Sequence, residues 1–281
     1  MAWIDLHLHT TCSDGLYTPS ELLQAVRSTR VIAFAVTDHD TIEGYREVKK
    51  LLTGDDPELI PGVELSVLIG ERDLHLLAYE FDPDNLELND ALARFREKRN
   101  QRGALMVQKL NQQGVAIDFK TVEEVAGGSA IGRPHIAQAL FDLGITSHFE
   151  EAFHKYIGNA CPAYVPKSML SPDEAIELVH QAGGVAVVAH PFIDDMYVHV
   201  ERLAAQGLDG VEVYHYAHSR QQRNQLRKLA RRLKLIQTGG SDFHGRSYRE
   251  SQIGAQEVPE SILVELHKRA EQIAEQTRGS K

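Results

Sequence analysis

The stretch that decides the fold is Ile4-Asp5-Leu6-His7-Leu8-His9-Thr10-Thr11-Cys12-Ser13-Asp14-Gly15. Its first residues alternate in the manner of a β-strand, which places His7 and His9 on the same face. Two imidazoles at the end of a strand can bind one ion. Imidazole suits zinc, manganese, iron and nickel, and added carboxylates favour harder ions such as manganese. Taken alone, this H-x-H pattern is explained equally well by two solvated histidines on an edge strand.

Composition limits the class of protein. A chain of 281 residues fits one barrel domain or two smaller domains. The net charge of −10 argues against broad non-specific binding of nucleic acid, although a local basic pocket remains open. Two cysteines suit a reducing compartment, and the sequence has neither a signal peptide nor a run of 18 apolar residues. We therefore expect a cytoplasmic protein without membrane spans and without an obligate protein partner.

A strand, a polar cluster and a helix follow one another repeatedly along the chain. This order is typical of a parallel barrel whose active site lies at the carboxyl ends of the strands. It predicts an α/β fold, a distorted TIM-like (β/α)7 barrel, because eight clean units cannot be counted. The predicted strands and their polar residues are 3–9 with His7 and His9, 31–36 with Asp38 and His39, 59–63 with Glu64, 73–79 with His75, 184–189 with His190, 210–214 with His215, and 235–240 with Asp242 and His244.

Residues 84–160 interrupt this alternation. A long helix is predicted from Leu86 to about Gln113, and three shorter helices follow it. We interpret 84–160 as a helical insertion that caps the barrel mouth and contacts the substrate. Residues 1–83 and 161–281 then form the barrel domain.

Nine side chains of metal-ligand type fall at or near the predicted strand ends. One ion cannot use nine ligands, whereas a cluster of two or three ions can. Any single histidine among them is more often structural, but H-x-H, D-H-D and S-D-x-H all occur where strands stop. The candidate ligands are His7, His9, Asp14, His39, Glu64, His75, His190, Asp242 and His244.

These motifs resemble those of the PHP (polymerase and histidinol phosphatase) family of metal-dependent phosphoesterases. The resemblance rests on an ordered set that spans most of the predicted barrel. Within the family, the chain is most similar to free-standing members that act on nucleoside 3′,5′-bisphosphates and on the 5′ ends of short RNA, and Gly132-Arg133-Pro134-His135 is part of that likeness. The matching segments are Asp5–Thr10 with Ser13–Gly15, Thr37–Asp40, Pro61–Glu64, Ala189–Pro191 and Gly240–His244.

The resemblance implies a PHP fold with three divalent ions. Family members commonly use manganese, with zinc, iron or magnesium as substitutes, and the mixture of imidazole and carboxylate agrees with manganese without selecting it. The motifs assign His7, His9, Glu64 and Asp242 to the first ion, a bridging Glu64 with His75 and His190 to the second, and Asp14, His39 and His244 to the third.

The expected reaction is in-line attack on phosphorus by a hydroxide that bridges two ions. The leaving alkoxide needs a proton, and the candidate acids are His215 and Asp38. Support of a metal ligand is the more frequent role for residues in such positions.

Arginines of the predicted insertion suggest how the substrate is chosen. Arg96, Arg99 and Arg102 lie on one helix, and such a run is most often a solvated face. If Arg99 and Arg133 turned toward the metals, they could bind a second phosphate in a bidentate manner, with His135 beside them. The expected substrate is then a nucleoside 3′,5′-bisphosphate that loses its 3′-phosphate to give a 5′-monophosphate. Short 5′-phosphorylated RNA, trimmed 5′ to 3′, fits the same pocket.

The sequence leaves other hypotheses about function open. Histidinol phosphate needs no second anion site and is an alternative substrate. Amidohydrolase barrels, which hydrolyse C–N bonds, share H-x-H but usually carry a bridging lysine where Glu64 stands here. A non-enzymatic accessory domain is a further alternative, and complete ligands argue against it. Tyr164, Phe192 and Tyr216 could stack on a base or belong to the core.

Overall fold

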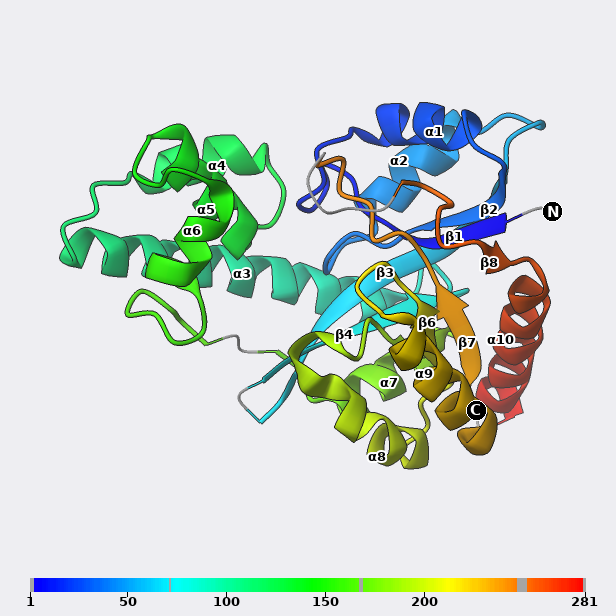
Figure 1. The fold of residues 1–281 in the computed structure, drawn as a ribbon. Helices are drawn as coiled ribbons and strands as arrows, with labels where there is room; N and C mark the ends of the chain where they lie inside the picture. The colour runs from blue at the N-terminus through cyan, green and yellow to red at the C-terminus, as the bar shows by residue number, and fades with distance from the viewer. Residues whose placement is uncertain (1–2, 71, 167–168, 247–251, 280–281) are drawn as a thin grey trace.

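An eight-stranded sheet organises the structure, a computed structural model that describes residues 3–70, 72–166, 169–246 and 252–279 (Figure 1). The order of strands is β7-β6-β5-β4-β3-β2-β1-β8. The strands are β1 (Trp3–Leu8), β2 (Val31–Val36), β3 (Glu58–Ile69), β4 (Arg72–Tyr79), β5 (Val185–Val188), β6 (Gly210–Tyr214), β7 (Ile236–Gly239) and β8 (Val258–Pro259).

The sheet curls until its two ends meet. Just beyond β7, Phe243 forms a parallel bridge with Leu8, and the His9 N–H donates to the Phe243 carbonyl at 2.9 Å. Gly240 makes this approach possible, because a Cβ there would lie 2.4 Å from the His7 backbone nitrogen. The nearly closed, barrel-shaped sheet confirms the predicted fold class.

Two strands run against the others: the short β8, which is antiparallel to β1, and β4. β4 is antiparallel to both β3 and β5, whereas the alternation in the sequence predicted parallel strands throughout. Only two residues separate Ile69 from Arg72, and a parallel crossover needs a dozen or more. β3 is also longer than predicted, so Glu64 lies within the strand and not at its end.

Helices cover the outside of the sheet, as α1 (Pro19–Arg27), α2 (Glu43–Leu51), α7 (Pro172–Gln181), α8 (Val200–Ala205), α9 (Arg220–Leu233) and α10 (Ser261–Gly279), with a 3-10 helix, η2 (Ile193–His199). Local sequence fixes several of their starts. Thr18 caps α1 and forms a capping box with Glu21, and Ser171 does the same for α7. Such caps satisfy N–H groups that the first turn leaves unpaired.

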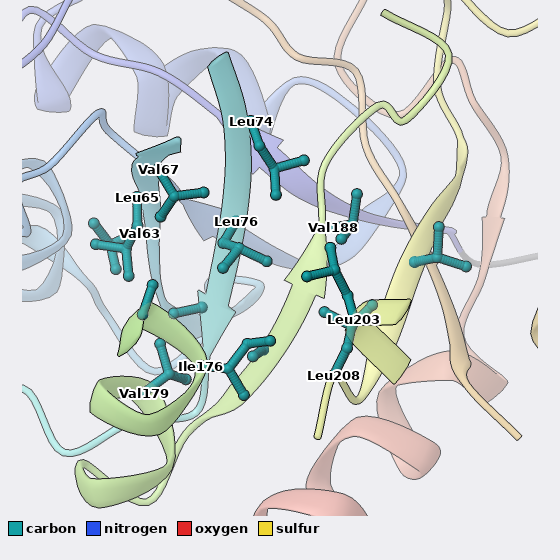
Figure 2. Close-up of a cluster of buried hydrophobic side chains, with 14 of the residues drawn as sticks. Val63, Leu65, Val67, Leu74, Leu76, Ile176, Val179, Val188, Leu203 and Leu208 are labelled. Carbon is teal, nitrogen blue, oxygen red and sulfur yellow. The ribbon is translucent and has the colours of Figure 1, made fainter. Parts of the chain in front are cut away.

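The packing of β3 decides which way Glu64 faces. Val63, Leu65 and Val67 alternate along the strand and pack with leucines of β4 against Ile176 and Val179 of α7, as Figure 2 shows. Each such buried side chain contributes about 1.5–3 kcal/mol. Because side chains alternate across a strand, burial of these three on the helix side directs Glu64 to the other face.

The helices between β4 and α7 form a hydrophobic cluster of their own. They are α3 (Leu86–Gln112), α4 (Phe119–Ala126), α5 (Arg133–Asp142), α6 (Phe149–Ala152) and a π-helical turn, η1 (Phe153–Ile157). In Figure 1, α4, α5 and α6 lie over the half of α3 that is remote from the sheet. Phe95 of α3 packs into the barrel cluster, whereas Met106 packs with α4 and α5. α3 therefore contributes side chains to both hydrophobic clusters. Among the described residues, no helix is long and apolar enough to cross a bilayer.

Candidate metal centre

The carboxylate of Glu64 lies at the centre of a group of imidazole rings. Its side chain is only 1% exposed. The five ring contacts are His7 Nε2, His9 Nε2 and His39 Nδ1 to Oε2 at 3.3, 3.3 and 3.2 Å, and His75 Nδ1 and His190 Nε2 to Oε1 at 2.8 and 3.1 Å. Both oxygens are thus shared between rings from different strands, as a ligand bridging two ions would be.

Two aspartates complete the arrangement. Asp242 Oδ1 lies 3.3 Å from Nε2 of both His7 and His9, and Asp14 Oδ1 lies 3.3 Å from His244 Nε2. Three groups of donor atoms could each hold an ion: His7, His9 and Asp242; His39, Glu64 and His75; and His9, Asp14, His39 and His244. The structure therefore brings all nine candidate ligands together, with His190 joined through Glu64.

Backbone pairing explains why these distant residues meet. The Asp40 N–H donates to the Glu64 carbonyl at 3.0 Å, and the Ala189 N–H donates to the His75 carbonyl at 3.0 Å. His190 and Asp242 have φ values of 24° and 52°, which non-glycine residues seldom adopt. Strained backbone of this kind is concentrated at functional sites, where surrounding structure holds it in place.

The donor set fits divalent cations. Both nitrogens of His9, Nδ1 of His39 and Oδ1 of Asp14 are buried without a hydrogen bond, so one nitrogen of each neutral imidazole and the carboxylate oxygen could each donate a lone pair to a cation. Burial alone would raise the pKa of Asp14, but His244 and His39 hold it well below the usual range. Burial would lower the pKa of His9, yet Asp242 and Glu64 raise it to about 10. Cations bound there would take the place of the protons that these imidazoles otherwise hold against the carboxylates.

The two candidate general acids, Asp38 and His215, have different hydrogen-bond partners. Asp38 accepts the Thr10 N–H and hydroxyl, both at 2.7 Å, and the Ser13 hydroxyl at 2.5 Å. Its carboxylate is thereby committed to holding the loop that carries Asp14. His215 Nδ1 accepts the Ala217 N–H at 3.2 Å, and its Nε2 lies 3.3 Å from Asp242 Oδ2. Because Nδ1 accepts, a neutral ring keeps its proton on Nε2, toward Asp242.

Glu212, which the sequence did not single out, contacts two of the candidate ligands, His7 and His190. It is fully buried in β6, and its Oε1 lies 2.9 Å from His7 Nδ1 while Oε2 accepts the His190 N–H at 2.8 Å. Burial raises its pKa, but His7 and His215 outweigh that effect and bring the value to about 2. One charged residue amid Gly210-Val211-Glu212-Val213 was the available signal, since a lone carboxylate in an apolar strand needs a partner.

Insertion residues reach the edge of the same centre. Arg99 donates from Nε to Asp40 Oδ2 at 2.6 Å and from an NH2 group to Ser66 Oγ at 2.8 Å. Arg133 donates to Asp73 Oδ2 at 3.2 Å. His135 is buried and accepts the Gly132 N–H at 3.0 Å; burial lowers its pKa, and the nearby Asp14 acts in the opposite direction. The structure thus places all three at the rim formed by the β1, β2, β3 and β4 segments.

Comparisons with known proteins agree with this geometry. The profile of the PHP domain matches residues 5–160. A protein of Salmonella typhimurium named 5′-3′ exoribonuclease Rnm is 34% identical over 247 residues, which covers 85% of this chain and 84% of that protein. A Chromobacterium violaceum protein named 3′,5′-nucleoside bisphosphate phosphatase is 33% identical over 250 residues, covering 87% and 88% respectively.

Solved structures give the same result. A protein from Bifidobacterium adolescentis assigned as a metal-dependent phosphoesterase superposes with a TM-score of 0.87 at 31% identity, covering 95% of this chain and 96% of the other. A structure from Chromobacterium violaceum, described as an amidohydrolase with bound sulfate and no metal, gives 0.85 at 31% identity, covering 95% and 97%. Profile, relatives, fold and donor groups all agree: this chain belongs to the PHP domain family of phosphoesterases.

Proposed function

We propose that this protein is a 3′,5′-nucleoside bisphosphate phosphatase that removes the 3′-phosphate and leaves a nucleoside 5′-monophosphate. The observation that carries the proposal is the buried carboxylate of Glu64 in contact with five imidazoles, beside two arginines of the insertion. A 33% identical relative bears the name of this activity.

Three divalent ions, with manganese as the first choice, are proposed for the nine candidate ligands. Bound there, they would supply Lewis acidity toward a phosphoryl group and acidify a water molecule. Glu64 would hold two of them together, and Asp14 with His244 would hold the ion on the insertion side. Glu212 fixes the His7 ring so that its Nε2 faces Glu64 and Asp242.

The chain also offers a proton for the leaving oxygen. His215 is buried at the end of β6 and carries its proton on Nε2 toward Asp242, so we retain it as the candidate general acid. Asp38 is better explained as a positioning residue, because three hydrogen bonds from Thr10 and Ser13 occupy its oxygens. Its role is then to hold Asp14 in reach of His244.

A second phosphate is proposed to bind at Arg99, Arg133 and His135. Arg133 has its guanidinium over the rings of Phe153 and Tyr164, at 5.9 and 5.8 Å, and its contact with Asp73 orients it along the rim. Arg99 is fixed by Asp40 and Ser66. Arginines that are held by neighbours lose little entropy on binding and suit bidentate recognition of phosphate.

The test compares phosphate release from adenosine 3′,5′-bisphosphate, 5′-AMP and histidinol phosphate with manganese-loaded protein. We expect hydrolysis of the bisphosphate at a kcat/KM at least about 100-fold above that of 5′-AMP, since the second anion contributes binding only when present. Arg133→Ala should raise the KM for the bisphosphate by about 10- to 100-fold. The exposed Arg94→Ala is the matched control on α3. Equal hydrolysis of 5′-AMP would refute the two-anion site, and preference for histidinol phosphate would favour that alternative.

Trimming of short 5′-phosphorylated RNA is the second candidate activity. The relatives named 5′-3′ exoribonuclease, at 34% identity, favour it. The same geometry would place the RNA 5′-phosphate at the arginines and the first internucleotide phosphate at the metals. Release of single nucleotides from the 5′ end of a labelled oligoribonucleotide would support it, and internal cleavage would contradict it.

A further inference from the structure

Helix α9 carries an unusual concentration of positive charge. Six of the chain's 30 basic side chains lie within its 14 residues, which contain no aspartate or glutamate. The whole chain has a net charge of −10, so this helix contrasts with the rest of the surface. Basic residues in the last turn favour the helix dipole, but Arg220 stands at the first turn, where the dipole opposes a positive charge. Helix stability therefore does not account for the pattern.

Some of these charges are engaged within the protein and others are directed to solvent. Arg223 donates to the His215 carbonyl and to Gln256, and Arg232 pairs with Glu201. Arg220, Lys228 and Arg231 are exposed, and among the described residues they form no salt bridge. Positions 220 and 231 are about three helical turns apart, so these side chains form one stripe about 16 Å long.

An exposed aromatic ring lies between the metal centre and this stripe. Tyr216 follows the end of β6, is 38% exposed, and has its ring centroid 4.5 Å from that of His215. From there the chain passes through Ser219, which caps α9, to Arg220. An aromatic platform followed by a row of cations is the combination that binds single-stranded nucleic acid, by stacking on bases and pairing with phosphates.

The position of Tyr216 and α9 indicates in which direction a bound RNA strand would run. Arg99 and Arg133 contact residues of the β2, β3 and β4 segments, whereas Tyr216 and α9 follow β6, on the other side of the centre. In Figure 1, α9 lies beside β6 and β7, well apart from α4, α5 and α6. A strand whose 5′-phosphate is held at the insertion and whose next phosphate reaches the metals would leave on the β6 side.

We propose that Tyr216 and the α9 stripe, which comprises Arg220, Lys228 and Arg231, bind the single-stranded RNA that continues 3′ of the scissile phosphate. The direction of the strand rests on the proposed function, but binding to the stripe does not. The surface makes the enzyme sensitive to the length of its RNA substrate while leaving mononucleotide substrates unaffected.

The test measures RNA binding apart from catalysis. Fluorescence anisotropy with 3′-labelled, 5′-phosphorylated oligouridylates of 3 and 12 nucleotides, in EDTA, gives affinities without cleavage. We expect tighter binding of the longer RNA, and we expect R220Q/K228Q/R231Q to weaken it by about tenfold or more. The salt slope of log K should fall by about 2, since each phosphate contact on a single strand contributes about 0.7. The matched control R30Q/K50Q/K268Q removes three exposed positive charges elsewhere and should leave both quantities unchanged.

Further measurements make the result decisive. Tyr216→Leu should weaken binding of the 12-mer without changing the salt slope, because stacking is not electrostatic. The triple variant should hydrolyse the bisphosphate as fast as the wild type does. If the wild type itself does not hydrolyse the bisphosphate, only the proposed function is refuted. Equal effects of the two triple variants, no dependence on length, or equally tight binding of duplex RNA or anionic vesicles would overturn the inference.

Discussion

Replacement of Glu212 by glutamine tests whether the centre is built for metal. Two nitrogens contact this carboxylate: His7 Nδ1 lies 2.9 Å from Oε1, and the backbone N–H of His190 donates to Oε2 at 2.8 Å. Glutamine offers one accepting end and one donating end. If its oxygen serves His190, its NH2 group faces His7 Nδ1 and forces the His7 proton onto Nε2, the nitrogen that faces Glu64 and Asp242.

The expected magnitude follows from this mismatch. Loss of a residue that orients a metal-bound histidine typically costs 10- to 100-fold in metal affinity. That range corresponds to about 1.4–2.8 kcal/mol. An unsatisfied buried donor costs about 1–3 kcal/mol, which is the same range of free energy. We expect Glu212→Gln to weaken manganese binding by this factor and to recover much of its activity at high manganese.

Calorimetric titration of the metal-free protein with manganese measures the effect directly. Glu177→Gln removes the same charge from an exposed position on α7 and serves as the control. Circular dichroism confirms that each variant is folded. A Glu212→Gln protein that is folded and binds manganese within about twofold of the wild type would refute the orienting role of Glu212.

Two further predictions concern stability. Gly240→Ala should lower the free energy of unfolding by more than about 2 kcal/mol, because the new Cβ would lie 2.4 Å from the His7 backbone, whereas Gly54→Ala, with no atom within 4 Å, should be nearly neutral; equal melting temperatures would contradict the closure of the barrel at this point. Burial lowers the pKa of His218 from 6.5 to about 4, so its neutral form contributes stability above pH 6.5 that is lost as the pH falls toward 4. In EDTA, the free energy of unfolding of His218→Phe should therefore fall by about 2–3 kcal/mol less than that of the wild type between pH 7 and pH 4.5. Parallel curves from denaturant titrations would show that folding does not shift the pKa of His218.

Much of the centre could be predicted from the sequence because local pattern and parallel topology act together. His7 and His9 follow from the period of a strand, and Asp242 and His244 follow from the point at which an apolar run stops. Carboxyl ends of parallel strands meet at one end of a barrel, so residues far apart in the chain were expected to converge. The structure places His7 and His9 each 3.3 Å from carboxylate oxygens of Glu64 and Asp242, and it places His244 3.3 Å from Asp14.

Other features depended on contacts that no local pattern encodes. The pairing of Glu212 with His7 joins residues 205 positions apart, and the register of β6 against the rest of the sheet decides it. The roles of Arg99 and Asp38 likewise depend on which neighbour each side chain meets across the fold.

The amino-acid sequence by itself indicated the fold class and the nine candidate ligands, because strand period and residue chemistry are local properties, and the ordered motifs carried the resemblance to the family. Only the tertiary structure decided that Glu64 lies between five imidazoles, that Glu212 meets His7, and that Arg99 meets Asp40. These facts are set by packing between segments that are distant in the chain, whose free energy is shared among many contacts and cannot be assigned to any one stretch of sequence.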